Sequence, residues 1–243
     1  MPTPTTESSA ELRVRPYQPT DRQAVRDLCC DTGYLGQPID PVFEDRELFA
    51  DFLTSYYTDQ EPECCFILER NGAVKGYLLG ARKRFALQLS GLLPMAWSAL
   101  RLLWRYPGYR TSSKAYVRWL VTKGWRETPE APKDAAHFHI NILPEARSLD
   151  KTRELFNAFF DHLRAAGEKR VYGQMSTFET RRTEGLFKRY GFTVMNRSEI
   201  TKYKDFTPQP IYLTTCVREL EPAGDGENYT IRTRRHGKAG VQP

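Results

Sequence analysis

Alternating apolar and polar positions predict that much of this chain forms a β-sheet. Strands are predicted over 11–17, 136–143, 170–176, 192–203 and 211–220. Two more apolar runs flank Asn71-Gly72, a pair that favours a tight turn between antiparallel strands. Residues 63–82 are therefore predicted to form an antiparallel hairpin.

Apolar positions three and four residues apart predict helices between these strands. The first two helices are expected to begin at Thr20 and Asp45. The second of them is expected to turn four side chains inward, those of Leu48, Phe49, Phe52 and Leu53. Two further helices are predicted over 149–166 and 180–190, each stopped by a glycine. The resulting order of elements contains a parallel crossover unit and indicates an α/β domain over 11–220.

Residues 83–135 are too many for an ordinary loop, and we predict a helical insertion between the third and fourth strands. Helices are expected around Pro94 and after Pro107-Gly108. Charge also sets this region apart, because residues 70–126 contain 12 Lys and Arg residues and no Asp or Glu. The rest of the chain has 24 basic and 30 acidic residues, so the net charge of +6 reflects one segment.

Several roles fit this basic and aromatic insertion. We favour a helical lid that packs on the domain with its Lys and Arg side chains facing water. Residues 85–125 also suit a membrane surface, an acyl-carrier protein, an acidic substrate, a long acyl chain or a homodimer interface. Nucleic acid is not an expected partner, because the aromatic residues are interleaved with apolar ones and no recognised nucleic-acid motif occurs.

The two ends and the cysteines bear on location. Residues 1–10 and 221–243 are predicted to be disordered from their polar composition. Neither a basic-then-apolar leader nor a run of about 18 apolar residues occurs, so no signal peptide and no spanning helix are expected. The five cysteines lack zinc-binding spacing, and their odd number favours reduced thiols and a cytoplasmic location. No metal site is predicted.

Several sequence stretches carry a resemblance to a known family. They are CCDTGYLGQPID at 29–40, GYLLGA at 76–81, HFHINILPEAR at 137–147, RAAG at 164–167 and KRYGF at 188–192. Together with the element order, they resemble the GNAT superfamily of N-acetyltransferases over about Leu12 to Leu220. Within it, the chain is similar to bacterial relatives of the acetyltransferase-like domain of O-GlcNAcase proteins.

This resemblance implies a fold and an activity. The GNAT fold is a mixed, mostly antiparallel sheet flanked by helices, with a parallel and splayed central pair formed by the fourth and fifth strands. The activity implied is transfer from acetyl-CoA or another acyl-CoA to a small-molecule amine, by direct attack of the amine on the thioester. Both depend on an open slot between 136–143 and 170–176.

The resemblance also implies which residues hold the cofactor. The pantetheine arm is expected along the backbone of Ile142 and Leu143. The diphosphate is expected at the start of the next helix, where unpaired N–H groups meet the positive end of the helix dipole. The residues concerned are Arg147, Ser148, Asp150, Lys151, Thr152 and Arg153.

This loop departs from the family pattern. Asp150 and Thr152 stand where glycines are expected, and a carboxylate there repels a diphosphate. Lys151 and Arg153 offset part of that repulsion. As an alternative, Ser148 or Asp150 simply caps the helix.

The catalytic groups also depart from the pattern. Phe187 holds the place of the tyrosine that protonates the leaving thiolate, and Phe187 is predicted to contact the cofactor instead. Tyr190 lies on a different side of the helix and is the remaining tyrosine candidate. His139, with His137 on the same strand face, is the candidate general base, unless this polar face only makes hydrogen bonds across the sheet. These departures favour a second hypothesis, a non-catalytic GNAT-fold protein that binds a lipid, membrane or protein partner.

Overall fold

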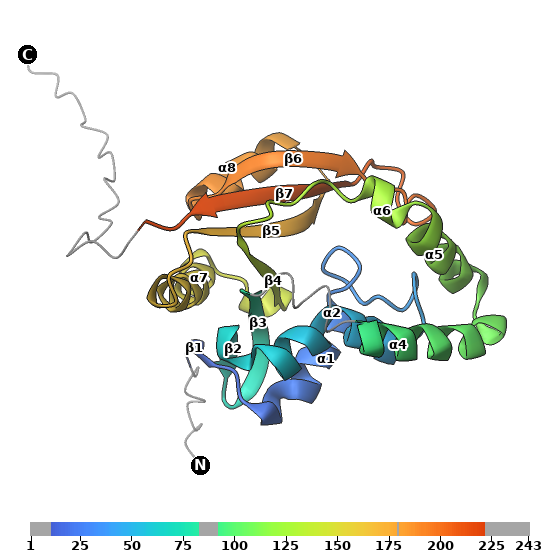
Figure 1. Cartoon of the computed structure of the whole chain (residues 1–243), viewed down its shortest axis with the longest axis horizontal. Coiled ribbons are helices and arrows are strands. Elements are labelled where there is room, and N and C mark those ends of the chain that lie inside the picture. The colour runs from blue at the N-terminus through green and yellow to red at the C-terminus, as the bar shows by residue number, and fades with distance from the viewer. Residues whose placement is uncertain (1–10, 83–91, 179, 222–243) are drawn as a thin grey trace, which may run out of the picture.

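Seven strands form one mixed sheet in the part of the chain that a computed structural model describes, residues 11–82, 92–178 and 180–221 (Figure 1). The strands are β1 (Arg13–Pro16), β2 (Cys65–Arg70), β3 (Ala73–Ala81), β4 (Ala136–Ile142), β5 (Arg170–Thr177), β6 (Thr193–Glu199) and β7 (Tyr212–Glu219). They lie in the order β1-β2-β3-β4-β5-β7-β6. Neighbouring strands are antiparallel except β4 and β5, which are parallel. This is the mixed α/β sheet that the sequence predicts.

Helices cover both faces of the sheet. α1 (Arg22–Asp31) and α2 (Arg46–Gln60) pack on one face, and α7 (Leu149–Ala165) packs on the other (Figure 1). α8 (Thr180–Arg189) lies against β6. Short 3₁₀ turns occupy Pro19–Asp21, Pro62–Cys64, Tyr106–Gly108 and Pro144–Ala146.

The two faces of the sheet form two apolar cores. The α7 core shows why periodicity predicts this helix: the five apolar positions of its repeat are all buried, namely Leu155, Phe156, Phe159, Phe160 and Leu163. They pack against alternate residues of the strands, such as Phe138. On the opposite face, Val25 of α1 and Ile67 of β2 belong to the second core.

Single residues determine the turn between β2 and β3 and the start of α7. Asn71 and Gly72 both have positive φ angles, 53° and 77°, as a two-residue hairpin turn requires. The Ser148 hydroxyl accepts a hydrogen bond from the Lys151 N–H at 3.1 Å and caps α7. The predicted hairpin and the predicted capping role of Ser148 are thus confirmed.

In the described part of the segment between β3 and β4, residues 92–135, three helices occur where the sequence predicts a helical insertion. They are α4 (Leu92–Arg105), α5 (Thr111–Thr122) and α6 (Gly124–Glu127). α4 runs beside α2, and ion pairs of 2.8 and 2.9 Å join Arg101 to Asp51 and Arg105 to Asp45. The insertion therefore packs on the domain, although these arginines face acidic α2 residues and do not all face water as expected.

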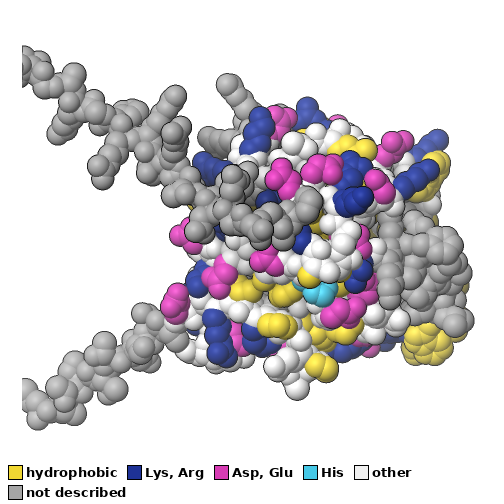
Figure 2. Space-filling model, turned by 60° about the vertical axis from the view of Figure 1, so that its left-hand side comes forward, with side chains coloured by type: hydrophobic (Ala, Val, Ile, Leu, Met, Phe, Trp, Pro, Cys, Tyr) yellow, Lys and Arg dark blue, Asp and Glu magenta, His cyan; other side chains and the backbone are white. Residues whose placement is uncertain are grey.

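Basic and acidic side chains are interspersed over the face of the molecule shown in Figure 2. Of the described helices, none has both the length and the apolar character needed to cross a bilayer. Residues 1–10 and all but Glu221 of 221–243, the segments predicted to be disordered, lie outside the described residues, as does the start of the predicted insertion, 83–91.

Two expectations about individual elements are wrong. Phe52 is 61% exposed on α2 and does not join the core, because it faces a cleft described below. The strand predicted over 192–203 ends at Glu199 as β6. Ile200 and Tyr203 are buried as apolar residues of a loop, which explains why their pattern resembles that of a strand.

Candidate active site

The parallel strands β4 and β5 separate after a short paired stretch. Only the Ala136–Phe138 stretch of β4 pairs with β5, where its partners are 171–173. Beyond this point, β4 stays paired with β3, and β5 stays paired with β7. A gap therefore opens between the two strands, as the sequence analysis requires for a thioester site.

Backbone groups of β4 face this gap. The Leu143 N–H donates to the Lys75 carbonyl at 2.9 Å, on the β3 side of the strand. Because backbone direction alternates along a strand, Ile140 and Ile142 direct their N–H and carbonyl groups to the open side. The Leu143 carbonyl accepts from the Ala146 N–H at 2.9 Å. The Leu143 N–H is therefore already bonded within the sheet, and the cofactor contact predicted for Leu143 stays a prediction.

A cleft of about 1710 Å³ extends from this gap. It is larger than the roughly 300–1,000 Å³ of an ordinary ligand pocket. Most of the predicted site residues line it: His137, His139, Ile142, Arg147, Ser148, Thr152, Phe187 and Tyr190. Leu143, Asp150, Lys151 and Arg153 do not line it.

The N-terminus of α7 meets the cleft beside Arg147. The Leu149 and Asp150 N–H groups lie in the first helical turn, where no intrahelical carbonyl can accept from them. The Arg147 guanidinium donates from Nε to the Ile142 carbonyl at 3.0 Å, and no ion pair of Arg147 occurs among the described residues. A donor-rich end of the cleft results, with positive charge and free N–H groups.

Asp150 does not obstruct this end of the cleft. Its side chain is 93% exposed and pairs with Arg153 at 3.3 Å. Lys151 pairs with Glu154 at 2.9 Å and with Glu11 at 3.2 Å. The two cations expected to offset Asp150 therefore lie in exposed ion pairs, and Arg147 is the cation beside the N-terminus of α7 that lines the cleft.

Several solved structures share this fold. SsHAT is 26% identical to this chain, with a TM-score of 0.57, and the match covers 87% of this chain and 99% of SsHAT. The putative acetyltransferase yncA from Salmonella typhimurium, solved with acetyl-CoA, is 15% identical over 90% of this chain and 99% of its own, with a TM-score of 0.51. A GNAT superfamily phosphinothricin acetyltransferase from Sinorhizobium meliloti, in complex with acetyl-CoA, is 14% identical over 86% of this chain and 88% of its own, with a TM-score of 0.50. No family model matches the sequence.

The chain has the fold of the GNAT N-acetyltransferases. Its sheet order, its single parallel pair and the gap within that pair agree with this assignment. The closer relationship to O-GlcNAcase proteins stays a prediction.

The two histidines of β4 differ in their surroundings. His137 lies in the paired part of β4, where its Nδ1 is hydrogen-bonded to the Tyr57 hydroxyl at 2.8 Å and its ring packs 4.8 Å from that of Tyr172. His139 lies just beyond the last paired residue of β4, and its Nδ1 is buried without a hydrogen-bond partner among the described residues. His139 is therefore the histidine at the gap with a ring nitrogen left to react.

Burial sets the charge of His139. Desolvation lowers its pKa to about 4, although a hydrogen bond to the Leu53 backbone raises it slightly. The imidazole is neutral near pH 7 and keeps a lone pair, but it holds a proton weakly.

Phe187 and Tyr190 flank the cleft on the α8 side. Phe187 is only 3% exposed, so an apolar ring occupies the position of the family's acid tyrosine. The ring of Tyr190 packs 5.2 Å from that of Phe156. The catalytic role predicted for Tyr190 stays a prediction.

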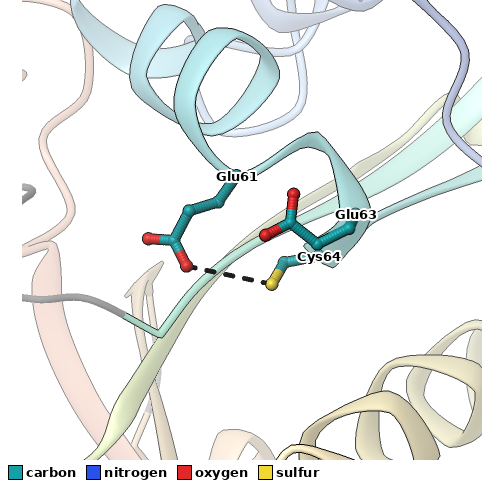
Figure 3. Close-up of side chains that lie close together, drawn as sticks. All are labelled: Glu61, Glu63 and Cys64. Carbon is teal, nitrogen blue, oxygen red and sulfur yellow. Dashed lines mark hydrogen bonds between the residues drawn. The ribbon is translucent and has the colours of Figure 1, made fainter.

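Glu61, Glu63 and Cys64 form a separate cluster whose potential ligand atoms all lie within 4.8 Å of one another (Figure 3). Glu61 is 1% exposed and accepts hydrogen bonds from the Tyr56 hydroxyl at 2.8 Å and the Arg82 N–H at 2.9 Å. Burial raises the pKa of the Cys64 thiol to about 12, which keeps it protonated. Through these two bonds, Glu61 connects α2 to the end of β3, which is a structural role.

The far end of the cleft was missed by sequence reasoning. Its walls carry aromatic side chains from α2 and from the insertion, and one cation from the loop between β6 and β7: Phe52, Tyr56, Trp97, Trp119, Trp125 and Lys202. The aromatic composition of the insertion was a usable signal. Nothing in the sequence pointed to Lys202, because the loop that carries it was predicted to be a strand.

Proposed function

We propose that this chain is a GNAT-type N-acyltransferase that transfers an acyl group from acetyl-CoA or another acyl-CoA to the nitrogen of a small-molecule amine. The amine attacks the thioester carbon, a tetrahedral intermediate forms, and the carbon–sulfur bond breaks. The amine nitrogen loses a proton, and the departing thiolate takes one up.

One observation carries this proposal: a single cleft joins the backbone N–H groups of Ile140 and Ile142, which face away from β3, to the N-terminus of α7. The backbone N–H groups suit the pantetheine amides and the oxyanion of the intermediate. The α7 N-terminus and Arg147 suit the diphosphate, with Ser148 and Thr152 beside it. His139 accepts the proton, and the thiolate leaves with little help because the pKa of a free thiol is only about 8.5.

The test compares acetyl-CoA with S-acetyl-pantetheine, which has the thioester arm but no diphosphate. Isothermal titration is expected to show that Arg147→Ala weakens acetyl-CoA binding about tenfold, equivalent to about 1.4 kcal/mol. Binding of S-acetyl-pantetheine is expected to stay unchanged. Lys151→Ala serves as the control, because its charge is already paired outside the cleft. Absence of binding by acetyl-CoA and longer acyl-CoAs to the unaltered protein would end the proposal.

A second candidate function is a non-catalytic GNAT-fold binding protein. The buried Phe187 ring in place of an acid favours it. Its partner would contact the outer face of α4, where Trp97, Leu100, Leu103 and Trp104 are each more than half exposed. Acyl-CoA binding without release of free CoA in the presence of a broad panel of amines would support this candidate.

The proposed partners of the insertion and the location stay predictions. A membrane surface or an acyl-carrier protein is expected to meet the apolar face of α4, because Arg101 and Arg105 are engaged by α2. A homodimer through the same face and a cytoplasmic location are the remaining predictions.

A further inference from the structure

Lys202 lies in the loop between β6 and β7 and projects into the aromatic end of the cleft. It is half-buried, and its Nζ lies 4.7 Å from the ring centre of Tyr203, 5.2 Å from that of Trp119 and 5.8 Å from that of Tyr116. Ring faces attract a cation but accept no conventional hydrogen bond from it. Within residues 11–82, 92–178 and 180–221, Lys202 has neither an ion pair nor a hydrogen bond from its three N–H donors.

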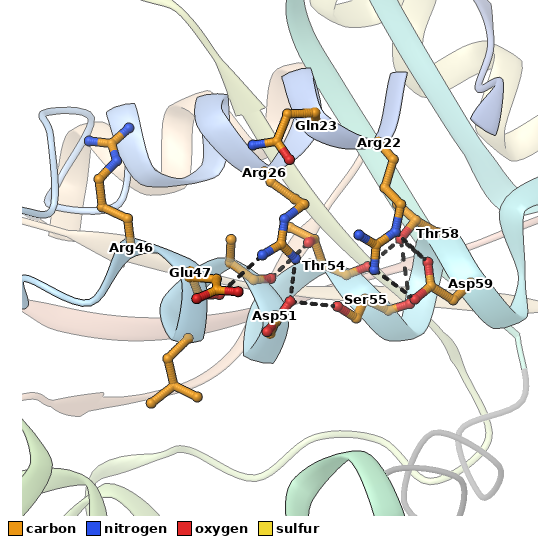
Figure 4. A network of polar contacts seen from close by, with 12 residues as sticks. Arg22, Gln23, Arg26, Arg46, Glu47, Asp51, Thr54, Ser55, Thr58 and Asp59 are labelled. Atoms are coloured by element: carbon orange, nitrogen blue, oxygen red, sulfur yellow. Dashed lines mark hydrogen bonds and ion pairs between the residues drawn. The ribbon is translucent and has the colours of Figure 1, made fainter. Parts of the chain in front are cut away.

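The other charges of this end of the cleft are already paired. Asp51 pairs with Arg26 and, at 2.8 Å, with Arg101. Asp59 pairs with Arg22 at 3.0 Å, and Figure 4 shows both Arg22 and Arg26 reaching from α1 to carboxylates on α2. Among the described residues that line this end of the cleft, Lys202 is thus the charged side chain that has no ion pair.

The loop that carries Lys202 is held in place on both sides. Glu127 of α6 accepts hydrogen bonds from the Thr201 N–H and hydroxyl, each at 2.7 Å, and from the Trp119 indole N–H at 2.5 Å. The Tyr203 hydroxyl donates to the Gly33 carbonyl at 3.3 Å. The cation and its rings are therefore fixed before any ligand arrives, which reduces the ordering needed on binding.

We propose that Lys202 binds a carboxylate on an aromatic amine acceptor, so that the acceptor class is an amine that carries both an aromatic body and one negative charge. A single ammonium matches a single carboxylate in charge, and the surrounding rings match the apolar body. Arg147 is bonded to the Ile142 carbonyl beside the N-terminus of α7, the end proposed for the cofactor, which leaves Lys202 for the acceptor. This inference rests on the proposed function and adds the substrate class.

The test uses two probes of nearly the same shape, indole-3-propionate and its neutral amide. Isothermal titration is performed on the full chain, with and without CoA. The unaltered protein is expected to bind the carboxylate about tenfold more tightly than the amide. Lys202→Gln is expected to abolish this preference while leaving amide binding within about twofold, and Lys202→Arg is expected to retain it.

Three results would overturn the inference: equal binding of the two probes by the unaltered protein, binding of neither at about 10 mM, or an undiminished preference in Lys202→Gln. A separate titration with acetyl-CoA distinguishes the two levels of the argument. If acetyl-CoA binds and the carboxylate preference is missing, the acceptor class is wrong and the transferase proposal stands. If acetyl-CoA does not bind, the transferase proposal itself fails.

Discussion

His139 combines burial with an unpartnered ring nitrogen. Its Nδ1 has no partner among the described residues, and burial lowers its pKa to about 4. A base with so low a pKa takes a proton only briefly, which suits removal of a proton from the positively charged intermediate better than from a free ammonium ion. The same burial makes His139 a source of pH-dependent stability.

We expect the free energy of unfolding to fall as the pH falls from about 6.5 to about 4. In this range His139 is protonated in the unfolded chain but stays neutral in the folded chain. The unfolded chain therefore binds more protons, and a lower pH favours unfolding. The contribution of this one residue is at most about 3.4 kcal/mol across the window. Urea unfolding of the unaltered protein and of His139→Gln between pH 7.5 and pH 4 measures it. The two stabilities are expected to converge as the pH falls, and parallel pH curves would show that His139 has an ordinary pKa.

At the scale of elements, the sequence predicts those whose pattern is local. α7 repeats its apolar positions from Leu155 to Leu163 and has Ser148 as a cap, so its limits and its buried face could be predicted. The end of β6 could not, because Ile200 and Tyr203 are buried in a loop and apolar character alone does not separate a loop from a strand. Phe52 fits the helical period of a core residue, yet it faces the cleft that the insertion helps to form.

One end of the candidate site could likewise be predicted from the sequence, and the other could not. Its cofactor end could be predicted because β4, Arg147 and the start of α7 follow one another in the chain. Its acceptor end could not, because α2, the insertion and the loop at Lys202 meet only through tertiary packing. The charge imbalance of the insertion marked it as unusual without showing that α2 carries the matching carboxylates.

Glu127 joins the insertion to the loop between β6 and β7, and we expect Glu127→Ala to loosen both. The change leaves the Thr201 and Trp119 N–H groups without their acceptor and should cost about 1–3 kcal/mol. Hydrogen exchange is expected to become faster across 111–127 and 200–206. Glu130→Ala, on a neighbouring exposed residue, is the control. Unchanged exchange in both regions of Glu127→Ala would mean that the two segments hold together by apolar packing alone.

At the scale of the whole molecule, the excess positive charge is concentrated in the insertion but is partly neutralised across its contact with α2. Arg105 pairs with Asp45, whose side chain is only 6% exposed and also accepts from the Tyr109 hydroxyl at 2.5 Å. Burial raises the pKa of Asp45, but these hydrogen bonds outweigh it and the pKa is lowered overall. The insertion is therefore held on the domain by arginines of α4 that pair with carboxylates of α2 and its N-cap, two segments far apart in the sequence.

Replacing Arg101 and Arg105 together by Met is expected to lower the free energy of unfolding by about 1–3 kcal/mol, because Asp45 and Asp51 lose cations at a half-buried contact. Urea unfolding near pH 7 measures the loss, and limited proteolysis shows whether the insertion detaches first. The charge-matched control replaces Arg118 and Arg189, two exposed arginines that form no ion pair with described residues, and is expected to change stability by less than about 0.5 kcal/mol. Should both double variants lose the same stability, net charge would explain the effect. Should neither lose any, the lid would be held by its apolar contacts, and the acidic face of α2 would have to serve another purpose.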